Sequence, residues 1–166
     1  MALPAFSQQP SFFKIGEEEL KGVHIYDLLQ DKNLDYWIAT NNGLYQFDHY
    51  NFKKVECDKM TSSSVFNLIE NTKGEIYCHN LSGQIFKVIG EELSLFYQIP
   101  DSLMRHEISI EFDENDELTV LENSLFQVDA NKKVKILFSE PEAIFSGGFV
   151  RNIKGELSFY SVNQSQ

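Results

Sequence analysis

Short apolar stretches alternate with tight polar turns along the whole chain. Stretches such as 24–30 and 65–70 run into clusters of Asn, Asp, Gly and Lys, and another apolar stretch follows each cluster. This arrangement is typical of β-hairpins. Between the turns, no segment of about ten or more residues carries apolar side chains at helical spacing. The pattern therefore predicts antiparallel strands and excludes a helical repeat.

The hairpins share a common sequence. Residues 35–48 (DYWIATNNGLYQFD) align without a gap on residues 116–129 (DELTVLENSLFQVD). Residues 74–88 have the same layout with one extra residue, and residues 155–163 begin the pattern a fourth time. Further strand candidates stand before and after each copy, so that one unit contains four strands.

The spacing of the copies identifies the architecture. The position of Trp37 recurs at Tyr77, Thr119 and Ser158, which is a period of about 40 residues and is typical of four-stranded propeller blades. A sandwich or barrel would also contain short strands, but neither predicts similarity at this period. We expect an all-β fold of antiparallel propeller blades, with about 3.5 to 4 repeats. The expected divisions are a tail over 1–10, propeller repeats over 11–166, an orphan outer strand over 11–16, blades over 24–56, 65–99 and 107–138, and a partial blade over 143–166.

An arc of so few blades leaves an apolar sheet face in water at each end. Four blades can close on themselves, a second copy can cover the arc through its blade edges, or the chain can be a piece of a longer protein. We favour the last arrangement.

The composition and charge of the chain limit the classes of molecule that it can bind. Hydrophobic residues make up 42% of the chain, so a core can form without disulfides or metal. The net charge of -11 repels nucleic acid and anionic membrane surfaces, and no apolar run approaches the roughly 20 residues that cross a bilayer. The N-terminal ALPAFSQQ has the small residues of a signal-peptide cleavage tail, although a frayed terminus explains it equally well.

Searches for chemistry predict no catalytic residue, no cofactor and no metal. The four histidines, His24, His49, His79 and His106, are scattered and pair with no activating carboxylate at a recognisable spacing. DENDEL, from Asp113, offers oxygen ligands for calcium, but it lacks the loop glycine and the bidentate Glu, so a solvated hairpin turn is the better interpretation.

The cysteines and the repeated aromatic residues have structural interpretations. Cys57 and Cys78 are not at the spacing of zinc ligands, and we expect free thiols in preference to a disulfide. The two cysteines do not identify the redox compartment of the protein. Trp37, Tyr45, Phe86 and Phe126 can be mistaken for a sugar-binding platform. Their recurrence at the repeat spacing instead favours packing between blades.

Residues 36–48 (YWIATNNGLYQFD) closely resemble the two-component regulator propeller repeat, in which a Leu-Trp-Ile-Gly-Thr strand precedes a Gly-Leu-Tyr strand that ends in Asp. The matching positions are Trp37, Ile38, Thr40, Gly43, Leu44, Tyr45 and Asp48, and Ala39 replaces a glycine. MTSSSVFNLIENTKGEIY also looks like the link between blades of that family. Later units depart from the motif, with Tyr77 and Thr119 in place of Trp.

The resemblance implies the periplasmic sensor region of a membrane-anchored two-component or hybrid histidine kinase, whose kinase would lie elsewhere in a longer protein. Such a region would bind a small extracellular ligand, for example a carbohydrate, at loops of one rim or in the central channel, by residues that the sequence does not identify. The alternatives are a stand-alone propeller that binds a protein partner and, third, a propeller lyase or hydrolase.

Overall fold

The computed structural model describes residues 14–101, 103–104, 108–122, 124–139, 145–152 and 156–163; for 145–147 and 161–163 it describes the backbone alone. All regular structure in these ranges is β-strand, paired in antiparallel sheets. The first sheet contains β1 (Ile25–Gln30), β2 (Tyr36–Thr40), β3 (Gly43–Phe47) and β4 (Phe52–Val55). The second contains β5 (Val65–Glu70), β6 (Ile76–Asn80), β7 (Gln84–Ile89) and β8 (Glu92–Gln98). The third contains β9 (Ser109–Phe112), β10 (Leu118–Leu121), β11 (Ser124–Val128) and β12 (Val134–Ser139), and the fourth contains β13 (Phe145–Arg151) and β14 (Leu157–Asn163).

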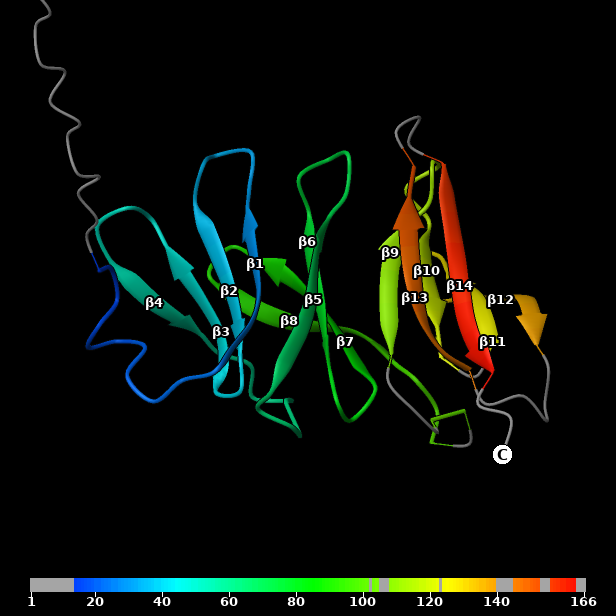
Figure 1. Ribbon diagram of the computed structural model, residues 1–166, viewed down its shortest axis with the longest axis horizontal. Coiled ribbons are helices and arrows are strands. Elements are labelled where there is room, and N and C mark those ends of the chain that lie inside the picture. The colour runs from blue at the N-terminus through cyan, green and yellow to red at the C-terminus, as the bar shows by residue number, and fades with distance from the viewer. Residues whose placement is uncertain are drawn as a thin grey trace, which may run out of the picture.

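The sheets are propeller blades in an open arc. Strands follow chain order within each sheet, so every four-stranded unit is a meander from an inner to an outer strand. Figure 1 shows the sheets side by side, with the inner strands β1, β5, β9 and β13 following one another across the molecule. The first and last sheets lie at opposite ends of this row. The predicted all-β fold of partial propeller type is confirmed, and the described blades do not close into a four-bladed ring.

The predicted N-terminal tail over 1–10 and the first residues of the predicted orphan strand over 11–16 lie outside the described residues. Lys14 and Ile15 are described and belong to no strand. A turn follows at 16–22. Gly16 has a φ of +73°, and a Cβ built there would lie 2.6 Å from the ring of Phe52, so this turn packs against the outer strand of the first blade.

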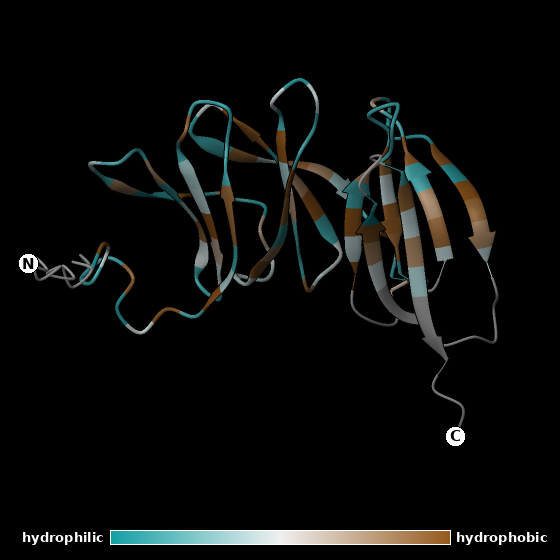
Figure 2. Cartoon of the chain, turned by 45° about the horizontal axis from the view of Figure 1, so that its top comes forward, coloured by the Kyte–Doolittle hydropathy of each residue, from teal (hydrophilic) through white to brown (hydrophobic). Residues whose placement is uncertain are grey.

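Two apolar clusters lie between neighbouring blades. The first joins the first two sheets, through Trp37 and Phe86 among others, and the second joins the second and third sheets, through Tyr77 and Phe126. Figure 2 shows that apolar residues follow the strands while polar residues occupy the turns. Trp37, Tyr45, Phe86 and Phe126 are all buried, as blade packing requires. The recurring aromatic residues are therefore core residues.

The turn after each inner strand begins with an equivalent Asp or Asn. These residues are Asp31, Asn71, Asp113 and Asn152. In each turn Oδ1 accepts a hydrogen bond, 2.9 to 3.0 Å long, from the backbone N–H four residues later. The Asp113 carboxylate of DENDEL also accepts from Asn115 N–H, and it therefore stabilises a hairpin turn. Among the described residues, no three His, Cys, Asp or Glu side chains are placed to hold a metal ion.

Cys57 and Cys78 are both free thiols. Cys78 is fully buried in the cluster between the first two blades, and Cys57 packs at the margin of the same cluster. Burial raises the pKa of the Cys78 thiol, and the nearby Cys57 raises it further. Cys78 therefore behaves as a small apolar residue with little thiolate character at neutral pH.

Candidate functional site

One position of each inner strand lines a common cavity in the concave side of the arc. This position lies four residues before the turn Asp or Asn, and it is occupied by Asp27, Asn67, Ser109 and Gly148. The cavity has a volume of about 480 Å³. The repeat itself therefore builds the cavity, because equivalent backbone positions of four blades converge on the channel.

The first two of these residues also join neighbouring blades. Asp27 Oδ2 accepts a hydrogen bond of 2.8 Å from the N–H of Leu68 on the next inner strand. Asn67 Oδ1 accepts one of 2.7 Å from the N–H of Ile110, again on the next inner strand. We call these two contacts the channel latches. They satisfy inner-strand N–H groups that would otherwise lack a partner.

Local backbone irregularity positions the latches. The pairing of β1 with β2 shifts between Ile25 and Asp27, and that of β5 with β6 shifts between Phe66 and Ile69. Within the second bulge Asn67 has a φ of +54°, a conformation that Asn tolerates better than most residues. The bulges therefore turn the latch side chains toward the channel and the next blade.

His79 is the most unusual group in the cavity wall. Its side chain is 4% exposed, its ring is stacked on Phe66 at 5.9 Å, and Nδ1 lies 3.4 Å from the carbonyl oxygen of Asn80. Among the described residues, Nε2 of His79 is the buried side-chain polar atom that makes no hydrogen bond. Such groups are rare in folded proteins because each one costs free energy.

The environment keeps this imidazole neutral. Burial lowers the pKa of His79 to about 4, and the backbone groups of Asn80 and Ile108 oppose this effect only in part. In the neutral ring one nitrogen has the proton and the other a lone pair, so Nδ1 donates to the carbonyl of Asn80 only in the tautomer with the proton on Nδ1. His79 therefore places a neutral ring in the cavity wall, with Nε2 buried behind the surface.

The remaining wall is nearly uncharged. Apart from His79, Asp27 is the one acidic or basic side chain among the described residues that line the cavity, and its two oxygens accept hydrogen bonds from the N–H groups of Leu28 and Leu68. The polar atoms of Asn80 also have partners. Its amide nitrogen donates hydrogen bonds to the carbonyl oxygen of Ser62 and to Oε1 of Gln84, and its Oδ1 accepts one from the N–H of Ser82. An uncharged ligand with hydroxyl or amide groups fits this wall better than an anion.

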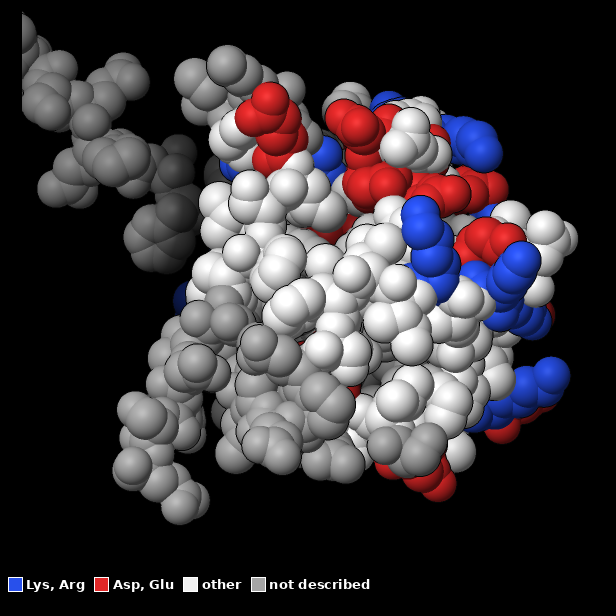
Figure 3. Space-filling view, turned by 90° about the vertical axis from the view of Figure 1, so that its right-hand side faces the viewer, with Lys and Arg blue, Asp and Glu red and all other residues white. Residues whose placement is uncertain are grey.

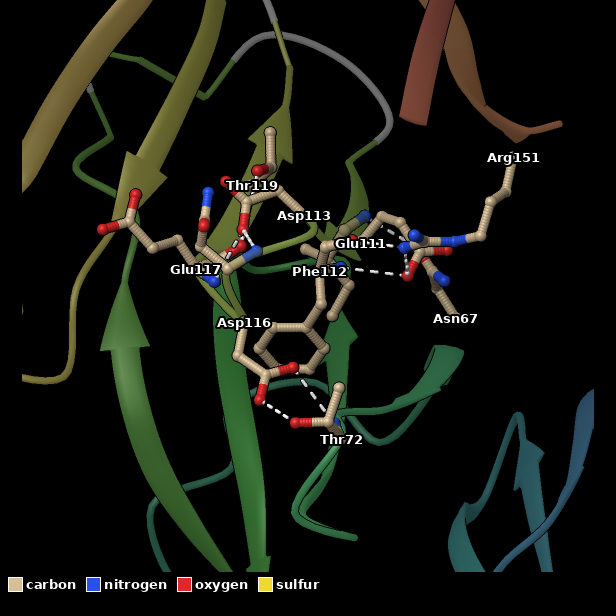
Figure 4. Close-up of polar contacts among 11 residues, drawn as sticks. Asn67, Thr72, Glu111, Phe112, Asp113, Asp116, Glu117, Thr119 and Arg151 are labelled. Atoms are coloured by element: carbon tan, nitrogen blue, oxygen red, sulfur yellow. Dashed lines mark hydrogen bonds and ion pairs between the residues drawn. The ribbon is translucent and has the colours of Figure 1, made fainter. Parts of the chain in front are cut away.

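The rim formed by the inner turns is locked by polar contacts between blades (Figure 4). The Thr72 hydroxyl and N–H both donate to Asp116 of the third blade, and these bonds hold the pKa of that carboxyl below its usual value. Arg151 of the fourth blade donates to the carbonyl oxygen of Phe112 and approaches Glu111. This rim therefore serves the assembly of the arc, which leaves the channel as the better candidate for a binding site.

Sequence reasoning placed a binding site in the channel or at a rim but identified none of its residues. The sequence predicts no catalytic role for His79, and the structure places this residue, buried, in the cavity wall. The signal for the latch position was available: counting back four residues from Asp31, Asn71, Asp113 and Asn152 finds the channel residue of each blade. The aromatic motif at Trp37 lies in the core and contributes nothing to the cavity.

Comparisons with solved structures find propellers. The extracellular domain of a proposed one-component system from B. thetaiotaomicron has a TM-score of 0.63 at 17% identity over 82% of this chain. The extracellular domain of a proposed hybrid two-component system from the same organism has a TM-score of 0.59 at 17% identity over 85% of this chain. A catalytically inactive virginiamycin B lyase from Staphylococcus aureus, solved with quinupristin, has a TM-score of 0.62 at 11% identity over 86% of this chain.

This chain spans only part of each of these proteins, namely 20%, 24% and 57% of their respective lengths. At such identities the likeness establishes the propeller fold alone. No protein-family model matches the chain, and no curated protein matches it. Within the described residues, no helix is long and apolar enough to cross a membrane.

Proposed function

We propose that the chain is part of the extracytoplasmic sensing region of a two-component type receptor, and that it binds a small uncharged ligand in the channel cavity. The observation that carries this proposal is the cavity itself, which four blades build from one repeated position. Two of the similar structures are extracellular domains of proposed signalling systems, which supports the extracytoplasmic location. The two-component regulator motif at 36–48 supports the same family and a longer parent protein.

Neutral saccharides are the first ligand class to test. Their apolar faces can contact Phe66 and Leu81, which line the cavity. The amide nitrogen of Asn67 and the hydroxyl groups of Ser109 and Tyr160 add donors at the cavity wall. An anionic ligand would meet no Lys or Arg among the described lining residues.

The test is a thermal-shift screen of the purified chain against neutral mono- and disaccharides, with free amino acids as a second class, followed by calorimetry on each hit. Leu81→Ala should weaken binding by about threefold to tenfold, because Leu81 lines the cavity and its removal loses apolar contact. Leu34→Ala is the matched control, since both side chains are 60% exposed and Leu34 lies at a distant turn. Equal affinities of the two variants, or no saccharide hit, would contradict this ligand assignment.

A lyase function deserves comparison because a virginiamycin B lyase shares the fold. The geometry favours binding over catalysis: both Asp27 oxygens accept backbone N–H groups, and His79 Nε2 is shielded from water. A general base needs a proton-accepting atom that the substrate can reach. We therefore assign no catalytic role to this chain, and turnover of a cavity ligand by the wild-type chain would refute that assignment.

A further inference from the structure

Each inner strand has an equivalent N–H group three residues before its turn Asp or Asn. In every blade the N–H of that Asp or Asn bonds a carbonyl oxygen across its own hairpin. N–H groups alternate between the two sides of a strand, and Ile110 and Phe149 pair with equivalent residues of the next strand. Their N–H groups therefore point away from the sheet, toward the channel. The four equivalent groups belong to Leu28, Leu68, Ile110 and Phe149.

Side chains of the cavity wall accept three of these four N–H groups. The channel latches accept those of Leu68 and Ile110. The other carboxylate oxygen of Asp27 accepts that of Leu28, at 2.8 Å. Within the described ranges, no side chain accepts the N–H of Phe149. An inner-strand N–H without an acceptor is a place where a ligand atom can bind.

The missing acceptor has a cause in the sequence. Ser109 occupies the latch position of the third blade, and its side chain is shorter than those of Asp27 and Asn67. Strand β9 also pairs with β10 without the shift that β1 and β5 show. The Ser109 hydroxyl makes no hydrogen bond within the described part of the chain. The latch between the third and fourth blades is therefore open, and this contact lies inside the arc.

The wall around the open latch offers donors and little charge. Asn67 accepts the N–H of Ile110 through Oδ1, so its amide nitrogen lies next to β9, and no described residue accepts from this nitrogen. The oxygens of Asp27 and Asn80 already have partners. Figure 3 shows the fourth-blade side, where Asp, Glu, Lys and Arg gather mainly along one side and along the upper edge, at the rim of inner turns. A neutral ligand with acceptor atoms fits this wall.

We propose that the cavity ligand closes the open latch with an amide carbonyl oxygen, which accepts hydrogen bonds from Phe149 N–H and from the Ser109 hydroxyl. A carbonyl oxygen accepts two hydrogen bonds and donates none, so it matches two donors better than a hydroxyl group does. The two existing latches use a carboxylate and an amide oxygen in the same way. Among neutral saccharides, Ser109 therefore selects N-acetylated amino sugars over unmodified hexoses. This inference rests on the proposed channel site and names the chemical class that the site selects.

Calorimetry with the full 166-residue chain compares N-acetylglucosamine with glucose. The acetylated sugar should bind about tenfold more tightly, because it alone supplies the carbonyl acceptor. Ser109→Ala should weaken binding of N-acetylglucosamine by about threefold to tenfold and leave the affinity for glucose unchanged. A merely structural role of Ser109 would change both affinities alike. Ser94→Ala is the matched control, since Ser94 is exposed on β8 and lies outside the cavity.

Amide hydrogen exchange followed by NMR locates the carbonyl contact. Saturating N-acetylglucosamine should slow exchange of Phe149 N–H by about tenfold, and it should slow exchange of Ile110 N–H much less, because Asn67 already accepts that group. Equal affinities for the two sugars, or an unchanged rate at Phe149, would overturn this proposal alone if Leu81→Ala still weakens binding in the cavity. Binding of neither sugar would overturn it together with the assignment of a saccharide ligand.

Discussion

The buried neutral His79 should make the stability of the fold depend on pH. Its folded pKa of about 4 is below the ordinary value of 6.5, so the unfolded chain takes up the proton first as the pH falls. Its contribution is therefore fully present above about pH 6.5 and is lost as the pH falls toward 4. At about 1.4 kcal/mol per pKa unit, the loss amounts to about 3 kcal/mol.

His79→Phe isolates this term. The substitution removes the titrating group and the unpartnered Nε2 while it keeps a ring against Phe66. The free energy of unfolding of the wild type should fall relative to that of the variant by about 3 kcal/mol between pH 7 and pH 4. At pH 7 the variant should be equally or more stable, because it buries no unsatisfied polar atom.

Urea unfolding followed by tryptophan fluorescence provides the measurement, since Trp37 is the single tryptophan and is 4% exposed. All samples are compared at one protein concentration, because self-association would shift apparent stability. Carboxyl groups such as Glu75 titrate in both proteins and cancel in the difference. His24→Phe, at an exposed site, is the matched control and should keep the wild-type pH profile. Parallel profiles for wild type and His79→Phe would refute the reasoning.

Three further predictions follow from the packing and the latches. Phe86→Ala should lower the free energy of unfolding by about 3 to 5 kcal/mol, measured by urea unfolding, because the ring is fully buried between two blades; an effect below about 1 kcal/mol would contradict this packing. Asn67→Leu should cost about 1 to 3 kcal/mol in the same assay by leaving Ile110 N–H without its acceptor, whereas Asn67→Asp, which keeps an acceptor, should cost less; equal losses would exclude the latch. Asp113→Ala should cost about 1 to 2 kcal/mol with no change on adding calcium, and a calcium-dependent rise in the melting temperature of the wild type would restore the calcium interpretation.

The sequence was informative where local chemistry repeats. Asp and Asn turns and apolar strands specify each hairpin, so the four-stranded units and their order were predictable from residues such as Asp31 and Asn71. The buried rings of Trp37 and Phe86 were predictable for the same reason, because recurrence at the blade period indicates packing.

The cavity was not predictable to the same degree, because it depends on how blades lie relative to one another. Asp27, Asn67, Ser109 and Gly148 have little chemistry in common, and only the position relative to the turn relates them. The unusual state of His79 arises from burial by the next blade, since the equivalent Ala39 and Leu121 are ordinary core residues. A single-blade pattern contains no information about such a neighbour.

The channel latches and the cavity depend on the same residues. Asp27 and Asn67 line the cavity and also bond the inner strand of the next blade, whereas Gly148, the equivalent residue of the fourth blade, has no side chain to make such a bond. A substitution at either latch should therefore change the contact between two blades and the wall of the cavity together.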